Sequence, residues 1–572
     1  MREKIWEYLE DTLKKDDIEA VSRQFKLPFE MAVLLLLRGV KSEESLNSYM
    51  SKSLSGIHSP FLFEDMEKAC ERIIASVKNK EKIVVYGDYD VDGITSTAIL
   101  TDFLESIGAN ADFYIPDRFN EGYGLNVMAV NRLAKSGVKL IITVDCGITS
   151  VGEVSFAKTQ GLDVIITDHH TCKEELPKAL AVINPKRPDT AYPFPQLAGV
   201  GVAFKLILAL SKTLEIPTKD TFLKYVDLAA IGTVADIVPL EGENRIIVSH
   251  GINKISKAEN CGINALLEVS GCREISSSAI AFSLAPRINA SGRMENASVA
   301  VNLFREKDAD TAKETAEHLD SLNKLRQQTE QIIYKEALSQ AEGFTEKPLV
   351  YVLKGENWHG GVIGIVASKI CEKYFRPCIL LSEADGKCKG SGRSIEGFNL
   401  FDALSDSDDI LTVFGGHASA AGMSLPSGLV SEFSKKINLY AKNHLTSDML
   451  TPKLYIDCRI EPSHVTLEWA KALKKFEPFG CKNEVPVFSM DNVQIVSAGA
   501  IGAQKQHLSL KLKKDGIYFN AVGFGIGDAS ENLSAGDYIN IAFTMNINIY
   551  QDRENLQLFI KDIKKQIGTA LC

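Results

Sequence analysis

Apolar runs alternate with helical patterns through the first half of the chain. Continuous runs rich in β-branched residues predict strands that are buried on both faces, as in a parallel sheet covered by helices. The expected strands are residues 83–86, 112–115, 140–144 and 164–167. Apolar residues at helical spacing predict the helices that accompany this sheet, at residues 95–107, 201–214 and 222–231. We therefore expect an α/β domain with a parallel sheet at residues 56–260.

Helical patterns also predict two other parts of the chain. Residues 1–55 show short amphipathic helical patterns and form an expected N-terminal helical segment. Residues 308–342 contain almost no glycine or proline, and leucines recur there at helical spacing. This pattern predicts a long connecting helix within a helical region at residues 261–342.

The remaining two parts differ from each other in pattern. Residues 343–450 show a second α/β pattern that is interrupted by glycines. From residue 451 to 572 the chain changes to short alternating strands, which are typical of a small antiparallel barrel of the OB type. The whole pattern predicts an α/β multidomain protein with a smaller second α/β domain and a C-terminal OB-like β-barrel.

Composition and charge mainly exclude classes of protein. The 572 residues exceed what one hydrophobic core organises, and no apolar stretch approaches the roughly 18 residues that a membrane helix needs. The charged N-terminus does not resemble a secretion signal. The 11 cysteines contain no Cys-x-x-Cys pair, which disfavours a disulfide framework or a thiolate zinc site and suits a reducing cytoplasm. With a net charge of −10, a nucleic-acid enzyme would need a local basic groove.

Acidic residues and histidines follow several of the predicted elements. Asp88, Asp90 and Asp92 come after the first strand, where a hard divalent cation would relieve their mutual repulsion. Taken alone, this cluster fits a solvated acidic turn equally well. Because the carboxyl ends of parallel strands meet at one edge of the sheet, distant positions can converge there. The further candidates are Asp145 after residues 140–144, Asp168, His169 and His170 after residues 164–167, and Asp236 after residues 222–231.

The types of side chain in this set predict the metal and the chemistry. Carboxylates with one or two imidazoles and no thiolate favour Mn²⁺ or Mg²⁺ over structural zinc. The set holds more carboxylates than one ion requires, so we expect two ions roughly 3.5–4 Å apart. Such a pair stabilises the attacking and the leaving oxygen of a phosphoryl displacement. The residues therefore predict metal-assisted phosphoester hydrolysis.

Four motifs, in this order, resemble those of a known superfamily. They are Asp-Tyr-Asp-x-Asp-Gly at 88–93, Val-Asp-Cys-Gly at 144–147, Asp-His-His at 168–170 and Thr-Val-Ala-Asp at 233–236. The chain resembles the DHH phosphoesterase superfamily and, within it, the bacterial single-strand-specific DNA exonucleases, from about residue 79 to near the C-terminus. This resemblance implies a parallel-sheet DHH domain, a DHHA1 domain and an OB-like domain. It also implies 5′→3′ hydrolysis of single-stranded DNA in repair and recombination.

The resemblance also implies the role of each site residue. His170 is expected against the scissile phosphate, and Asp145 is expected to bridge two divalent cations, with Mn²⁺ favoured and Mg²⁺ as the alternative. Many superfamily members have a histidine ligand where this chain has Tyr86. One coordination position is therefore open, for which Asp88 is a candidate. The implied metal ligands are Asp90, Asp92, Asp145, His169 and Asp236, and the expected catalytic set is Asp145, His169 and His170.

Two further segments are candidates for binding the substrate. The glycine-rich string at 414–422 could bring backbone N–H groups close to an anion, although a tight packing turn is an equal alternative. It resembles the substrate-binding motif of DHHA1 domains. The string at 286–294 carries two arginines, which suit phosphate oxygens, and it resembles a family segment that meets the 5′ end. The residues assigned to substrate binding are Arg287, Asn289, Arg293, Arg393, Gly415, Gly416 and His417.

The expected barrel carries basic and aromatic residues that suit a single strand. Charge and base stacking together bind single strands without sequence preference, although a solvated lysine face is an equal alternative. The candidate strand contacts are Lys505, Lys511, Lys513 and Tyr518. By contrast, Trp358 and His359 are expected to be structural rather than functional.

Two other functions stay open on the sequence. A phosphodiesterase acting on short oligonucleotides or cyclic dinucleotides would share the metal chemistry, but the barrel and the arginine segment favour a long strand. A catalytically inactive strand-binding scaffold is the least favoured, because none of the main acidic and histidine residues is missing. We expect single-stranded DNA as the partner, with a helicase and a single-strand binding protein as candidate protein partners. We also expect a cytoplasmic monomer without membrane contact.

Overall fold

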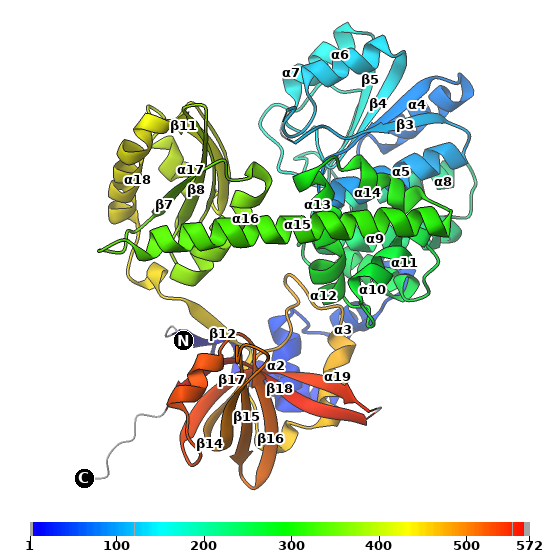
Figure 1. Ribbon diagram of the computed structural model, residues 1–572. Coiled ribbons are helices and arrows are strands. Elements are labelled where there is room, and N and C mark those ends of the chain that lie inside the picture. The colour runs from blue at the N-terminus through cyan, green and yellow to red at the C-terminus, as the bar shows by residue number, and fades with distance from the viewer. Residues whose placement is uncertain (1–3, 119, 552, 566–572) are drawn as a thin grey trace. The chain divides into compact units, whose positions relative to one another are not determined.

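The chain forms two compact units (Figure 1). The computed structural model describes residues 4–118, 120–551 and 553–565. The larger unit extends from Leu54 to Leu450, whereas the smaller unit combines the chain up to Ser53 with the chain from Thr451 onward. None of the helices within the described ranges has both the length and the apolarity needed to span a bilayer.

A five-stranded parallel sheet forms the centre of the first domain of the larger unit. The strands are β2 (Lys82–Tyr86), β3 (Asn110–Tyr114), β4 (Val138–Val144), β5 (Asp163–Thr167) and β6 (Ala181–Ile183). Their order is β3-β2-β4-β5-β6, and every neighbouring pair is parallel. The chain first adds β3 on one side of β2 and then β4 on the other, so the sheet has a switch point between β2 and β4. Ligands bind outside the carboxyl ends of strands at such a point.

Helices cover both faces of this sheet, as the apolar runs predict. Ile83 and Ile142 are buried on the face covered by α5 (Val91–Ser106), α8 (Gly199–Thr213) and α9 (Thr218–Ala235). Val84 and Ile141 are buried on the opposite face, under α6 (Val127–Lys135) and α7 (Val151–Thr159). Alternate residues of one strand thus enter two different cores, which explains why the strands are apolar throughout.

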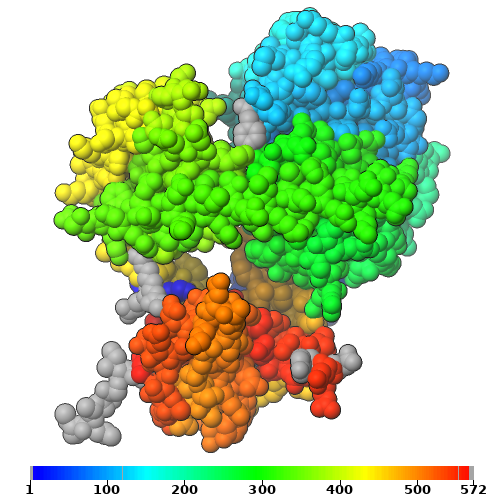
Figure 2. Space-filling model, viewed as in Figure 1, coloured from blue at the N-terminus to red at the C-terminus, as the bar shows by residue number. Residues whose placement is uncertain are grey.

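One long helix, α15 (Ala309–Glu342), packs on both domains of the larger unit. Leu319, in its N-terminal half, is buried in the core of the first domain, and Ile333 and Ala337 are buried in the core of the second. Figure 1 shows this helix running across both domains, and Figure 2 shows the green surface of this part of the chain on both of them. The other helices of this region are α4 (Met66–Lys78), α10 (Gly242–Ile255), α11 (Cys261–Ser270), α12 (Ser277–Ala279), α13 (Ala285–Met294) and α14 (Ser298–Arg305).

The second domain of the larger unit has a mixed five-stranded sheet. Its strands are β7 (Tyr351–Glu356), β8 (Cys378–Ala384), β9 (Lys387–Arg393), β10 (Val413–Gly416) and β11 (Ala420–Pro426). They lie in the order β10-β11-β9-β8-β7, and only β7 and β8 are parallel. The helices are α16 (Gly360–Tyr374), α17 (Leu400–Ser405) and α18 (Val430–His444). Trp358 is buried here and its indole N–H donates to Glu336 at 2.7 Å, which agrees with the structural role expected for it.

The smaller unit is a β-barrel that shares its core with the N-terminal segment. The main strands are β14 (Phe488–Ile501), β15 (His507–Lys514), β16 (Ile517–Gly523), β17 (Tyr538–Tyr550) and β18 (Arg553–Lys565), and pairing of β14 with β17 closes the barrel. This architecture confirms the expected OB-like barrel. Leu34 and Leu35 of α2 (Phe29–Leu37) are fully buried in the same core as Phe488 and Phe543. The other elements are α1 (Lys15–Phe25), α3 (Glu43–Met50), β12 (Lys453–Ile456), β13 (Cys458–Arg459) and α19 (Leu467–Leu473).

The helical expectation for residues 1–55 is wrong at one place. Ile5–Tyr8 forms a strand, β1, which pairs in parallel with β12. The partner strand lies more than 400 residues further along the chain, since Ile5 is opposite Lys453. A short strand of this kind is stabilised by long-range pairing, which local periodicity does not record.

The shared packing of α15 yields a test of stability. Replacing the fully buried Leu319 with Ala should destabilise the larger unit by about 2–5 kcal/mol, because the change leaves a cavity in the core. Leu325 lies on the same helix but is 48% exposed, so L325A should change stability by no more than about 0.5 kcal/mol. Urea unfolding of both variants measures the difference, and equal midpoints would contradict the packing.

Candidate metal centre and phosphate-binding cluster

Three aspartates lie in the turn between β2 and α5. Asp90 is the N-cap of α5, and its Oδ1 accepts a hydrogen bond from the Gly93 N–H at 3.1 Å. Asp88 precedes it and is buried, and its Oδ1 has no hydrogen-bond partner among the described residues. Asp92 is buried in the first turn of the helix. A strand end followed by a helix cap thus places three carboxylates within residues 88–92.

The N-terminus of α8 holds the Asp92 carboxylate. Its Oδ2 accepts a hydrogen bond from the Gly199 N–H at 2.7 Å, and its Oδ1 accepts one from the Val200 N–H at 2.8 Å. These N–H groups have no partner within their own helix and suit an anion. A Cβ at position 199 would lie 2.5 Å from Asp145 Oδ1, so only glycine allows the backbone to approach this closely.

Asp145 stands at the end of β4 in a left-handed backbone conformation. Its φ is +58°, which costs a non-glycine residue of order 1–3 kcal/mol and persists only where the surroundings enforce it. The Asp145 N–H donates to the Thr167 carbonyl of β5 at 3.0 Å, so the residue is still attached to the neighbouring strand. The turn directs a buried carboxylate to the edge of the sheet beside the switch point.

Asp168 fixes the orientation of His170. Its Oδ1 accepts hydrogen bonds from the His170 N–H at 3.1 Å and from His170 Nδ1 at 2.7 Å, and its Oδ2 accepts one from the Ile148 N–H at 2.9 Å. Burial is the largest influence and would raise the pKa of Asp168, but the hydrogen bond and charge of His170, together with the backbone N–H groups of Ile148 and His170, bring the pKa below the usual value. Burial likewise would lower the pKa of His170, but the Asp168 bond raises it. An ionised carboxylate therefore holds this imidazole, whose side chain is 41% exposed.

His169 lies at the centre of the acidic residues. Its Nε2 is 3.2 Å from Asp145 Oδ1, 3.6 Å from Asp236 Oδ2 and 3.9 Å from Asp92 Oδ2. Burial lowers the pKa of His169 to about 4, so the ring is neutral and able to bind a metal. The structure thus brings together the eight side chains that the sequence placed at strand and helix ends, seven as possible ligands and Asp168 as the partner of His170. Three overlapping groups could each hold a cation, namely Asp92, His169 and Asp236, then Asp88, Asp90 and Asp145, and finally Asp145, His169 and His170.

The carboxylates in this cluster repel one another. Burial, reinforced by the charges of Asp92 and Asp90, raises the pKa of Asp236 to about 9. Burial and the Asp90 charge raise the pKa of Asp92 to about 7, and burial with several neighbouring carboxylates raises that of Asp145. In addition, Asp145 Oδ1 and Asp236 Oδ2 are buried without a hydrogen-bond partner in the part of the chain described. Unpaired, uncompensated oxygens around a neutral imidazole fit two hard divalent cations.

A cluster of arginines lies beside the acidic residues. The pKa of Arg293 on α13 is lowered to about 10, mainly by burial. The positive charges of Arg118, Arg326 and Arg393 lower this pKa further, whereas the negative charge of Asp90 raises it. Burial and Arg118 also lower the pKa of Arg393. Arg293 Nη1 donates to the Gly361 carbonyl at 3.0 Å, so this cluster joins the first domain to α16 of the second. Arginines that repel one another in a partly buried site can be neutralised by an anion such as phosphate.

The two other α13 residues assigned to the substrate have different surroundings. Arg287 donates from Nε to Asp320 of α15 at 2.8 Å and from Nη1 to the Ser283 carbonyl at 2.7 Å. Its guanidinium therefore attaches α13 to the long helix instead of joining the repelling cluster. Asn289 lies half-buried on α13 between Arg287 and Arg293.

The glycine-rich string forms an exposed hairpin between β10 and β11. The His417 N–H donates to the Ala420 carbonyl at 2.8 Å and closes the turn. Gly416 has a φ of +143°, and a Cβ there would lie 2.4 Å from the Ala420 carbonyl oxygen, so glycine is required. Ala420 is paired with Arg393 of β9. The hairpin that carries Gly415, Gly416 and His417 therefore begins beside the strand that supplies Arg393.

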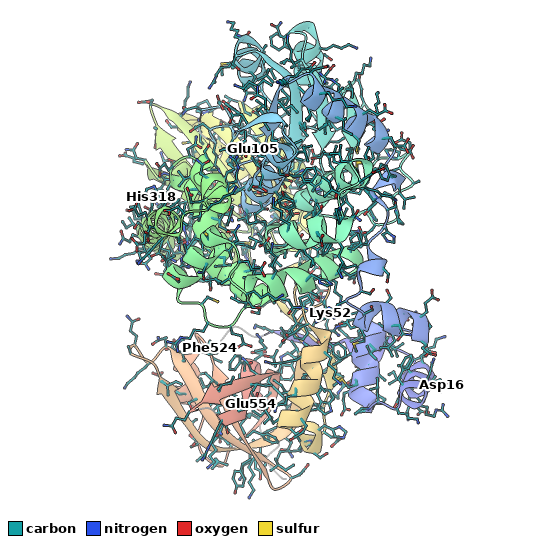
Figure 3. The ribbon with its side chains drawn as sticks, turned by 90° about the vertical axis from the view of Figure 1, so that its right-hand side faces the viewer. Asp16, Lys52, Glu105, His318, Phe524 and Glu554 are labelled. Carbon is teal, nitrogen blue, oxygen red and sulfur yellow. The ribbon has the colours of Figure 1, made fainter. Side chains whose placement is uncertain are left out.

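The barrel brings most of its candidate strand contacts together. The ammonium groups of Lys511 and Lys513 lie 5.6 and 5.2 Å from the ring centroid of Tyr518, which is 55% exposed. Lys505 is in the turn before β15. Phe524, labelled in Figure 3, adds an exposed ring that sequence reasoning missed, 5.2 Å from the His507 ring. Cationic and aromatic side chains therefore share one face of this unit.

Sequence reasoning also missed three residues of the larger unit's site. Arg118 and Tyr123 lie in the segment after β3, and Tyr89 lies between Asp88 and Asp90. The Arg118 guanidinium stands 4.8 Å above the Tyr89 ring. The rule that located Asp145, namely that ligands gather at strand ends, applies equally to the segment after β3. No cluster of acidic residues or histidines marks that strand end in the sequence.

The raised carboxylate pKa values predict proton release when a metal binds. At pH 7 the metal-free protein holds a proton on Asp236, and a cation must displace it, so Mn²⁺ binding should release roughly one proton or more. Affinity should therefore rise with pH between about 6 and 9, as protons stop competing. Calorimetry in two buffers of different ionisation enthalpy counts the protons. D236N should release fewer protons, whereas D102N, far from the cluster and bonded to Lys224, should not differ from the parent.

Comparison with known proteins agrees with this arrangement of domains and site. Three family models match: the DHH family N-terminal domain at residues 82–233, the DHHA1 domain at 346–443 and the RecJ OB domain at 456–562. The chain is 40% identical over 554 residues to the single-stranded-DNA-specific exonuclease RecJ of Bacillus subtilis, covering 96% of this chain and 69% of that protein. It is 34% identical over 566 residues to the RecJ of Escherichia coli, covering 94% and 96%.

Solved structures give the same result. RecJ from Thermus thermophilus in complex with Mn²⁺ matches with a TM-score of 0.84 at 29% identity, covering 99% of this chain and 80% of that one. The Mg²⁺ complex of the same protein matches with a TM-score of 0.78 at 28% identity, covering 99% and 78%. With this identity and coverage, the chain belongs to the RecJ family of single-stranded-DNA-specific exonucleases in the DHH superfamily.

Proposed function

We propose that this protein removes nucleotides from the 5′ end of single-stranded DNA by two-metal hydrolysis, in DNA repair and recombination. The observation that carries this proposal is that two opposite kinds of site lie within electrostatic reach of each other in one unit, since the charge of Asp90 acts on Arg293. A cluster of repelling carboxylates suits cations, and a cluster of repelling arginines beside it suits a phosphate. A substrate that enters both must present a phosphodiester and a further phosphate close to it.

The acidic groups suggest how two cations are shared. Asp92, His169 and Asp236 suit one cation, and Asp88, Asp90 and Asp145 suit the other, with Asp145 also within 3.2 Å of His169. In this assignment Asp88 takes the coordination position for which relatives use a histidine. When bound, Mn²⁺ or Mg²⁺ would supply Lewis-acid activation of water and of the phosphoryl group.

His170 and the arginines handle the substrate itself. His170 is ionically held by Asp168 and partly exposed, so its Nε2 can donate to a non-bridging oxygen of the scissile phosphate. Arg118, Arg293 and Arg393 would neutralise a second phosphate. A terminal phosphate monoester carries about −1.5 to −2 charges, more than a diester, so these arginines favour a strand end over its interior. The likeness of residues 286–294 to a family segment at the 5′ end supports this polarity.

The domains divide the work between them. We assign catalysis to residues 56–260, linkage to residues 261–342, substrate-end binding to residues 343–450 and strand binding to residues 451–572, with the N-terminal segment supporting the barrel. Lys511, Lys513 and Tyr518 would hold the strand by charge and stacking. We further propose that the protein works in a reducing cytoplasm, which is supported by the free state of every described cysteine. We also propose that it is a monomer, with a helicase and a single-strand binding protein as partners.

The first test is the chemistry and its polarity. D145A should reduce cleavage of a 5′-phosphorylated single strand by about three orders of magnitude or more in Mn²⁺, because bound metal supplies several kcal/mol to the transition state. Strand binding, measured by fluorescence anisotropy, should persist. Strands labelled at either end show the direction of digestion, and a dinucleotide digested in parallel tests the short-substrate alternative. Parental-rate cleavage by D145A would overturn the assigned site.

The second test is the arginine cluster. R293Q should weaken kcat/KM for a 5′-phosphorylated strand by about 10- to 100-fold, the range expected when one charged hydrogen bond is lost. The same variant should lose most of its preference for the phosphorylated over the unphosphorylated end. R305Q removes an equal charge at a residue paired with Glu105, and it should leave that preference intact. A preference retained in R293Q would place the terminal phosphate elsewhere.

A further inference from the structure

Tyr86 occupies the position where many relatives have a histidine ligand, and the structure gives its hydroxyl a different task. The ring is fully buried and stacks on Tyr114 with centroids 5.3 Å apart. Its hydroxyl donates to the Gly124 carbonyl at 3.0 Å and accepts from Asn126 Nδ2 at 3.1 Å. Both interactions are with the segment between β3 and α6. Tyr86 therefore attaches a loop to the sheet.

The backbone of the attached loop is left-handed on both sides of one residue, Tyr123. Gly122 and Gly124 flank Tyr123, and their φ values are +81° and +79°. A Cβ at either glycine would meet no atom within 4 Å, so the backbone conformation alone requires glycine at both positions. Two left-handed residues around one tyrosine turn its side chain towards the metal centre.

A second set of bonds fixes the start of the same loop. Tyr114 donates its hydroxyl to the Glu121 carboxylate at 2.7 Å, and Arg132 of α6 pairs with that carboxylate at 2.7 Å. The Asp117 N–H donates to the Glu121 carboxylate at 3.1 Å. The loop is therefore held at both ends by polar groups, of which Tyr86 is buried, Tyr114 and Glu121 are half-buried and Arg132 is exposed.

Tyr123 reaches the centre with its hydroxyl. This hydroxyl donates to the Asp145 backbone carbonyl at 3.2 Å and lies 3.4 Å from each ring nitrogen of His170. It therefore lies against the imidazole of His170 and touches the strained Asp145 turn. The ring itself is 51% exposed and packs edge-on to Tyr89 and His170.

We infer that Tyr123 is a positioning residue whose hydroxyl orients His170 and the Asp145 turn, and that Tyr86 serves this task by anchoring the loop that carries Tyr123. The inference rests on the proposed two-metal exonuclease function. Asp168 sets the direction of the His170 ring through Nδ1, and the Tyr123 hydroxyl lies against the same ring and limits its movement. Tyr86 uses its hydroxyl hydrogen for Gly124, so it anchors a loop where a histidine would bind a metal.

The test is steady-state cleavage of a 5′-phosphorylated strand by the full-length enzyme in Mn²⁺. Y123F keeps the ring and removes the hydroxyl with its hydrogen bond to the Asp145 carbonyl, so kcat should fall about tenfold, within the range expected for one lost hydrogen bond. KM and the calorimetric Kd for Mn²⁺ should stay within about twofold of the parent values, since no ligand is lost. Y225F removes a buried hydroxyl bonded to Asp102 and should leave kcat unchanged.

A double variant tests the link between the two tyrosines. Y86F should lower kcat by less than Y123F, and the Y86F/Y123F variant should be no slower than Y123F, because both changes act on one interaction. If the double variant lowered kcat by the product of the two single factors, the link between the tyrosines would be overturned. An unchanged kcat in Y123F would overturn the inference itself. A fall in kcat matched by weaker Mn²⁺ binding would also overturn it, since Tyr123 would then act on the metal. If the parent enzyme leaves the strand intact, the proposed function fails and this inference fails with it.

Discussion

Electrostatic repulsion between buried carboxylates is the constraint on which the first domain depends. Asp88, Asp92 and Asp145 lie together out of water, and each has a pKa well above that of a free aspartate. Such a cluster opposes folding unless cations compensate it, so the scaffold must be strong enough to hold it. The scaffold does this with backbone groups: the amides at the N-terminus of α8 bind Asp92, and the pairing of β4 with β5 holds Asp145 in its strained turn.

The same constraint explains why opposite charges are arranged in neighbouring clusters instead of being paired. Arg293 lies close enough to Asp90 for that charge to oppose the lowering of its pKa. Neither Arg293 nor Arg393 forms an ion pair with a carboxylate among the described residues. If the arginines neutralised the aspartates directly, neither cluster would attract a ligand. The substrate and its cations instead supply the missing charges to each cluster. Catalytic competence and instability of the empty protein thus have one physical origin.

Strand-end residues could be predicted from the sequence because two regularities combine there. Apolar runs mark parallel strands, and the topology of such a sheet brings strand ends to one edge, so Asp90, Asp145 and His169 could be grouped without coordinates. Contacts that depend on side-chain direction could not be predicted in this way. Arg287 and Arg293 stand six residues apart on one helix, but one pairs with Asp320 and the other joins the arginine cluster. β1 was missed because its partner strand lies at the other end of the chain.

Helix α15 gives the larger unit a property that neither domain has alone. A single helix whose two halves belong to two cores fixes the separation and the relative rotation of those cores by its number of residues. Each residue adds about 1.5 Å of length and turns everything beyond it by about 100°. The number of residues in the helix therefore sets the distance and the rotation between the two cores. Exposed side chains can be replaced without changing either, but an inserted or deleted residue would rotate Arg393 around the helix axis and away from Arg293. A change in the length of this helix should therefore disturb the site more than a change in its exposed side chains.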